Sequence, residues 1–100
     1  MTYIEKLQDV ILRLHGCESI HTSTVPVTER FRGQVIWSGK VEIFNIRGHP
    51  NAHHCYAWSY HDEQGTDQYT AVLELPPVRD ALTAVQAAIA AQVKNETKKT

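Results

Sequence analysis

The first sixteen residues carry apolar side chains at the spacing of an α-helix with one buried face. Thr2 and Glu5 can form a capping box, in which each side chain accepts the backbone N–H of the other residue. Gly16 can supply the left-handed residue at which such a helix ends. The side chains that share about 120° of arc are Tyr3, Ile4, Leu7, Val10, Ile11 and Leu14. The pattern predicts an amphipathic helix over about residues 2–15.

A second helical pattern lies near the end of the chain. Its apolar residues recur at three- and four-residue intervals: Val78, Leu82, Val85, Ile89 and Val93. Several alanines between them raise the helix propensity and allow close packing. Pro76 and Pro77 stop the preceding segment, and Asp80 can act as an N-cap or first-turn acid. The pattern predicts a helix over about 79–94, followed by a polar tail at 95–100.

Between these helices the apolar positions follow the period of two that is typical of β-strands. They predict a sheet over about 34–75, with its second strand at His54–His61 and its third at Gln68–Leu75. In the first strand, Ser38 and Gly39 interrupt the alternation. A β-bulge there would leave one long bent strand, whereas a two-residue hairpin would split it and make the sheet four-stranded. We favour the bulged strand and therefore three strands.

Residues 17–33 have a weak pattern, with serine, threonine and histidine around a Val-Pro-Val segment. Pro26 lacks the N–H that a central strand needs, so we interpret this segment as irregular. Because it is too long for a simple turn, Val25, Val27 and Phe31 are expected to pin it across the fold. One possibility is that it covers a face of the sheet.

The predicted order α-β-β-β-α gives an α+β fold, a three-stranded antiparallel meander in a single domain spanning residues 1–100. Both helices are expected to pack on one sheet face, against the small side chains of Cys55 and Ala57. The other face is then left open. Its exposed aromatic side chains would be Phe44, Tyr56, Trp58 and Tyr60. Aromatic patches of this size tend to mark a contact surface.

Composition and charge narrow the class of protein. The chain has 100 residues, 42% of them apolar and 21% charged, which is ordinary for a globular domain. Its apolar runs are too short for a membrane helix, and the start of the chain does not resemble a signal peptide, so we expect a cytoplasmic protein. Cys17 and Cys55 are then expected to be reduced, buried thiols. A net charge of -1 provides no long-range field to attract nucleic acid.

In the order of its elements the chain resembles the double-stranded-RNA-binding domain, whose first hairpin loop carries a Gly-Pro-x-His type motif. The similar stretch here is Gly-His-Pro-Asn-Ala-His at 48–53. Independently of the resemblance, we take His49, Asn51 and His53 of this loop as candidate binding residues. In that family the last helix opens with a lysine cluster that grips phosphates, whereas this chain has Val-Arg-Asp-Ala at 78–81. The resemblance therefore implies a shared topology and transfers no functional residue.

Histidines and cysteines provide the remaining candidate chemistry. His49, His53, His54 and Cys55, with Cys17 and His21, contain the atoms that bind zinc. However, the chain has no Cys-x2-Cys spacing, and the strand alternation directs neighbouring positions 54 and 55 to opposite faces. We therefore expect no metal and no other cofactor, and keep a metal-binding protein as a remote alternative. Cys55 as a nucleophile is disfavoured because a buried thiol behaves as a small apolar group, so we assign no catalytic residue.

Two functions fit this pattern better than an enzyme. The first is a protein-interaction module, with a protein partner or a second copy of the chain on the aromatic face. The alternative is a nucleic-acid-binding module in which the aromatic side chains stack on bases, with Lys40, Arg47 and the tail lysines around them. Charge favours the first, because Glu42 and Glu74 would share the outward face with the aromatic residues.

Overall fold

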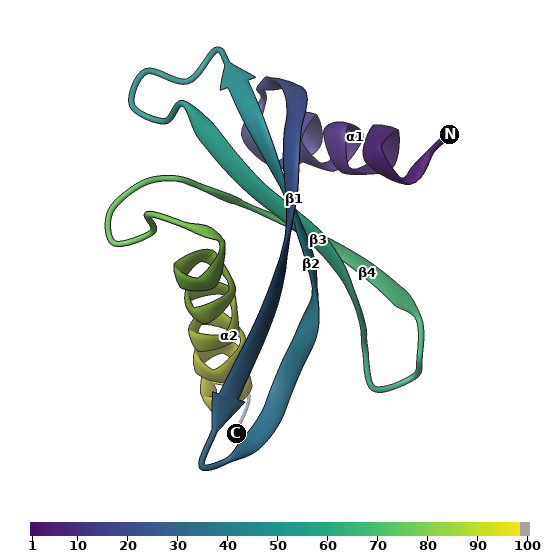
Figure 1. Ribbon diagram of the computed structural model, residues 1–100, viewed down its shortest axis with the longest axis vertical. Helices are drawn as coiled ribbons and strands as arrows, with labels where there is room; N and C mark the ends of the chain where they lie inside the picture. The colour runs from purple at the N-terminus through teal and green to yellow at the C-terminus, as the bar shows by residue number, and fades with distance from the viewer. Residues whose placement is uncertain (99–100) are drawn as a thin grey trace.

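The computed structural model describes residues 1–98, with side chains for residues 1–91. Along the chain the elements are α1 (Tyr3–His15), β1 (Glu18–Phe31), β2 (Gln34–Arg47), β3 (His54–His61), β4 (Asp67–Leu73) and α2 (Ala81–Lys98). Figure 1 shows this arrangement, which is of the predicted α+β class. Residues 95–98 of the predicted tail continue α2, and 99–100 lie outside the described residues.

Both helices begin with a side-chain cap. At α1, Thr2 Oγ1 accepts the Glu5 N–H at 3.2 Å, and Glu5 Oε1 accepts the Thr2 N–H at 3.1 Å. Gly16 ends the helix with a φ of 69°, a conformation that costs glycine little. At α2, Asp80 Oδ1 accepts the Thr83 N–H at 2.8 Å, so Asp80 acts as the N-cap.

The sheet has four antiparallel strands in the order β1-β2-β3-β4, so the expectation of three strands is wrong. The additional strand is β1, which is formed by the segment interpreted as irregular. Pro26 is accommodated because β1 is an edge strand and because of where Pro26 lies in the ladder. The hydrogen bond from Ile46 N–H to the His53 carbonyl directs the even-numbered residues of β2 toward β3. Pro26 is opposite the even-numbered Lys40, so its nitrogen faces the outer edge and no ladder bond is lost.

Strand β2 runs without a break through Ser38 and Gly39, as the bulged-strand interpretation requires, but the bulges lie elsewhere. The register between β1 and β2 skips Thr22 on one strand and Ile36 on the other. Gly39 has a different role: a Cβ atom at this position would lie 2.9 Å from Trp37 Cζ2. The glycine therefore leaves room for an indole ring that lies flat against the strand.

The helices lie on opposite faces of the sheet, so the prediction that both cover one face is wrong. Helix α1 packs on the face of Cys55 and Ala57, with Phe44 buried in the same cluster. Helix α2 packs on the opposite face, against Tyr56 and Trp58. Figure 1 shows the two helices separated by the sheet. The reason is visible in β3, where both sets of alternating residues are apolar, as in strands that are covered on both sides.

The four strands form two hairpins that remain together only near one end. β1 and β2 pair along their whole length, from Glu18–Arg47 to Phe31–Gln34 in register. β2 and β3 pair only from Asn45–His54 to Glu42–Ala57. Beyond this short ladder the hairpins diverge, and Figure 1 shows their turns pointing in different directions. The divergence leaves a cleft between the continuing parts of β2 and β3.

Candidate binding cleft

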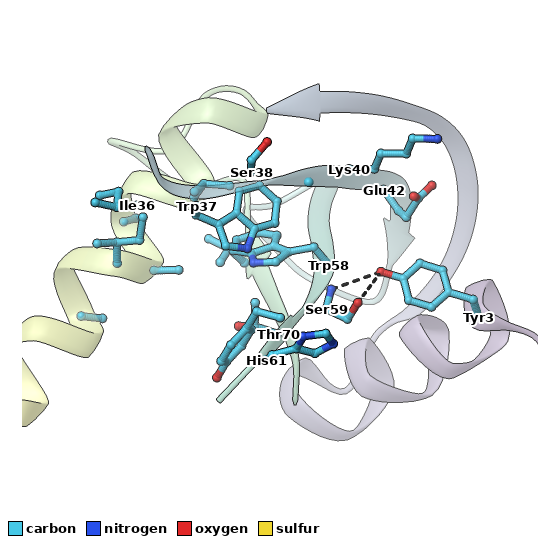
Figure 2. A pocket seen from close by; sticks show the side chains of 18 residues that line it. Tyr3, Ile36, Trp37, Ser38, Lys40, Glu42, Trp58, Ser59, His61 and Thr70 are labelled. Carbon is cyan, nitrogen blue, oxygen red and sulfur yellow. Dashed lines mark hydrogen bonds between the residues drawn. The ribbon is translucent and has the colours of Figure 1, made fainter. Parts of the chain in front are cut away.

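The cleft between the two hairpins has a volume of about 1210 Å³. Helix α2 closes it on one side, and the N-terminal end of α1 reaches it on the other (Figure 2). Its residues come from four segments that are distant in the sequence. They are Tyr3 of α1, Ile36 to Lys40 and Glu42 of β2, Trp58 to His61, Thr70 and Val72 of the second hairpin, and Val85, Ala87 to Ile89 and Ala91 of α2.

The wall on the side of α2 is apolar and aromatic. Trp37 from β2 and Trp58 from β3 pack against each other on this wall, with ring centroids 5.9 Å apart and planes inclined by 57°. This is the tilted geometry that aromatic pairs favour. Figure 2 shows the two indole rings together at the side of α2. They are the two tryptophans of the chain, so both report on this one site.

The wall on the side of α1 is polar. Tyr3 Oη accepts the N–H of Ser59 at 3.1 Å and donates to Ser59 Oγ at 3.2 Å (Figure 2). The pairing alternation of β3 directs the odd-numbered Ser59 toward β2, so this N–H belongs to the edge that faces the cleft. A tyrosine hydroxyl therefore satisfies a donor that a longer ladder would have paired with β2.

A buried carboxylate lies on the same side. Glu42 is 5% exposed, and among residues 1–91 it is the one buried charged side chain. Its Oε1 atom accepts hydrogen bonds from His21 Nε2 at 2.8 Å and from Thr24 Oγ1. The His21 ring in turn lies 5.3 Å from the ring of Phe44. A buried charge is tolerated only when its hydrogen bonds are satisfied, and these contacts satisfy those of the Glu42 carboxylate.

The cleft also exposes the edges of two strands. The β2–β3 ladder ends at Glu42 and Ala57, although both strands continue. The same alternation directs the N–H and C=O groups of Ser38 and Lys40 on β2 into the cleft. On β3, the C=O of Ser59 faces them. Unpaired main-chain groups along a strand are a template for pairing with another extended chain.

The structure separates the four aromatic residues that the sequence placed on one open face. Phe44 is opposite Cys55 in the ladder and is fully buried beneath α1. Tyr56 and Trp58 are 4% and 3% exposed beneath α2, so this face is covered. Tyr60 is partly exposed and lines the cleft. The prediction of an open aromatic face is therefore wrong. A binding role for Trp58 and Tyr60 stays a prediction, now as parts of the cleft wall.

Sequence reasoning missed three of the residues that shape the cleft, namely Tyr3, Trp37 and Glu42. Trp37 carried a signal, because an aromatic side chain can cover a glycine in a sheet, and Gly39 lies two residues away. Glu42 and Tyr3 carried none. Their positions depend on the register of β2 against β3 and on the placement of α1, and neither can be obtained from periodicity.

The candidate loop residues have a structural part in the β2–β3 turn. His49 Nδ1 accepts the N–H groups of Asn51 at 3.1 Å and Ala52 at 2.9 Å, which closes the turn around Pro50. Asn51 and His53 are exposed beside it. Within the described residues, no group of three or more histidine, cysteine or acidic side chains is arranged to hold a metal ion.

The two cysteines and one tyrosine are buried ionisable groups. Cys17 and Cys55 are both free thiols in the α1 cluster. Burial, with a smaller effect of Cys17, raises the pKa of Cys55 to about 12, so this thiol is protonated and unreactive at neutral pH. The pKa of Tyr56 is also raised, first by burial and then by its hydrogen bond to Glu74. Glu74 also contacts His54 Nδ1 at 3.2 Å.

Comparison with known proteins adds no relative. No protein family, curated protein or solved structure matches this chain. The observed order α-β-β-β-β-α also has one strand more than the order on which the resemblance to the double-stranded-RNA-binding domain rested. Neither helix in the described part of the chain has the length and apolar content that crossing a membrane requires.

Proposed function

We propose that this protein is a protein-interaction module that binds an extended polypeptide segment in the cleft between its two hairpins. One observation carries the proposal: β2 and β3 continue past the end of their ladder with main-chain groups directed into an aromatic-walled cleft. Addition of a strand to such an edge is a common mode of peptide recognition, in which main-chain hydrogen bonds supply affinity and side-chain contacts supply specificity.

The two walls determine which side chains the segment would carry. Successive residues of an extended chain point to opposite sides. Apolar residues of the segment would therefore face the half-buried Trp37 beside α2, and polar residues would face Tyr3 and Glu42 beside α1. Strand β2 offers the more accessible edge, because the Ser59 N–H on β3 is already bonded to Tyr3.

The nucleic-acid alternative has less support from the same cleft. A stacking site needs exposed aromatic faces within a positively charged groove. Here Trp58 is 3% exposed, and the cleft residue Lys40 is accompanied by the acidic Glu42 on the same wall. A polypeptide with alternating apolar and polar residues fits these walls better than a nucleic-acid strand.

Selection from a random library of displayed peptides about twelve residues long tests the proposal. We expect enriched sequences with apolar residues at alternate positions, and binding of a selected peptide should change the fluorescence of the two tryptophans. Trp37→Ala should weaken that peptide at least about tenfold, because it removes the aromatic anchor of the wall.

Leu12→Ala is the matched control, because Leu12 is an apolar α1 side chain that is 51% exposed and does not line the cleft. It should leave the affinity unchanged. The proposal fails if the library yields no binder, or if the selected peptides bind the Trp37→Ala variant as well as the original protein.

A further inference from the structure

The turns at the ends of the two hairpins carry opposite charges. The β1–β2 turn has Arg30 and Arg32 exposed on either side of Phe31. Glu29 precedes this turn, and with Arg30 and Phe31 it lines a small groove beside Ile89 of α2, so the turn keeps a net positive charge from its two arginines. The β3–β4 turn contains the acidic Asp62 and Glu63, and Asp67 follows at the start of β4, where it contacts His61 Nε2 at 2.8 Å. The Asp62 carboxylate accepts the N–H groups of Gln64 and Thr66 at 2.9 Å, which lowers its pKa and keeps it ionised.

The basic turn is also apolar. Phe31 is 61% exposed, Val35 50% and Ile36 48%. Arg32 lies over the Phe31 ring at 5.2 Å from its centroid. Phe31 and Ile36 lie together along the groove beside α2, and exposed apolar side chains gathered in this way are of the kind that marks a contact surface. Ile36 joins this patch to the cleft, because it lines the cleft as well.

Within one molecule these two turns cannot meet. The hairpins diverge from their short common ladder, and Figure 1 shows their two turns apart from each other. The basic turn also cannot enter its own cleft, because β2 is one wall of that cleft. Neither restriction applies between two molecules related by a two-fold axis. The hairpin end of each molecule can then meet the cleft of the other, so the same contact occurs twice.

We propose that the partner of the cleft is a second copy of this chain. Each copy places the end of its β1–β2 hairpin in the cleft of the other, with the outer edge of β1 extended along β2 and Phe31 beside the half-buried Trp37. Arg32 of each copy then lies beside the acidic β3–β4 turn of the other, where Glu63 is exposed. This inference rests on the proposed function of the cleft and names its occupant.

Charge reversal with heterodimer rescue tests this arrangement. Arg32 has a φ of 53°, which aspartate tolerates better than most residues, so Arg32→Asp reverses the charge without straining the turn. Glu63→Lys reverses the charge of the residue that would face Arg32. In each variant alone, positions 32 and 63 carry like charges at both contacts of the dimer, and dimerisation should weaken at least about tenfold. In an equimolar mixture both contacts are attractive again, so the heterodimer should form.

The measurement is sedimentation velocity of the full chain over a range of concentrations. The original protein should approach twice its monomer mass of 11.3 kDa. Lys6→Glu serves as the control, because it reverses an exposed charge on α1 away from both turns and should leave the dimer intact. Circular dichroism should show that all variants fold.

Each outcome decides the proposal. Loss of the dimer in both single variants and its return in the mixture would support it. A monomer at all concentrations would overturn the second copy as partner, while peptide binding in the cleft could still hold. A dimer that survives both reversals would overturn the reciprocal arrangement of the turns. If the peptide library yields no binder and the chain is also monomeric, the proposed function itself is overturned.

Discussion

Removal of the Trp58 side chain tests whether α2 seals the aromatic face of the sheet. Trp58 is 3% exposed and lies in the cluster formed with α2 residues such as Val85, with Trp37 beside it. Truncation of a buried tryptophan to alanine costs about 3–5 kcal/mol, through lost burial and the cavity that remains. This is a large part of the roughly 5–15 kcal/mol by which a domain is stable.

The assay for Trp58→Ala is urea and thermal unfolding followed by far-UV circular dichroism, at protein concentrations low enough to avoid association. A loss of 3 kcal/mol corresponds to a fall in Tm of at least about 12 °C for a domain of this size. Trp37→Ala is the comparison, because this indole is only half-buried and its removal should cost less. A loss below about 1.5 kcal/mol for Trp58→Ala would refute the reasoning, since it would place this side chain outside the core.

Two further predictions concern buried ionisable groups. Tyr56→Phe should lower the free energy of unfolding by about 1.5–3 kcal/mol in urea titrations at neutral pH, because Glu74 loses a hydrogen bond to its charged carboxylate; an unchanged midpoint would contradict this contact. Burial raises the pKa of Cys55 from 9.0 to about 12 on folding. The protonated thiol therefore contributes fully to the free energy of unfolding below pH 9, and this contribution is lost as the pH rises toward 12. Cys55→Ala should therefore make the free energy of unfolding fall less steeply across this interval, and parallel pH profiles for variant and original protein would count against burial of the thiol.

The helices could be predicted from the sequence because the capping signals that mark their ends are local. The capping box of Thr2 and Glu5, the terminal Gly16 and the Asp80 cap are all present as hydrogen bonds or backbone angles. Each depends on residues within one helical turn, so no knowledge of the rest of the fold is needed to interpret it.

The sheet could be predicted from the sequence only in part, because the features that were predicted wrongly depend on long-range strand pairing. Pro26 is compatible with β1 only when β1 lies at an edge with the proline nitrogen outward, and periodicity does not reveal which strand is at the edge. In β3, Cys55 and Ala57 are as buried as Tyr56 and Trp58, so no polar face indicated where a helix was absent. The placement of both helices on one face followed from that missing signal.

The cleft was the feature least predictable from the sequence. The cleft exists because the β2–β3 ladder stops at Glu42 and Ala57 while the strands continue. Nothing in the residue pattern marks that point, since polar and apolar residues alternate through Glu42 on β2, and β3 stays apolar on both faces through Ala57 and Trp58. The length of a ladder depends on how two hairpins twist against each other and on the helices between which they pack.

Amide hydrogen exchange at Lys40 tests the central claim most directly, because this N–H is directed into the cleft whereas that of Val41 pairs with β1. In dilute protein without ligand, NMR should find the Lys40 amide exchanging rapidly and the Val41 amide protected. Saturation with a peptide selected from the library should protect Lys40 at least about tenfold more, since the open edge of β2 then pairs with the bound segment. A Lys40 amide that is as protected as Val41 in the free protein, or that stays unprotected when the peptide is bound, would contradict strand addition in the cleft.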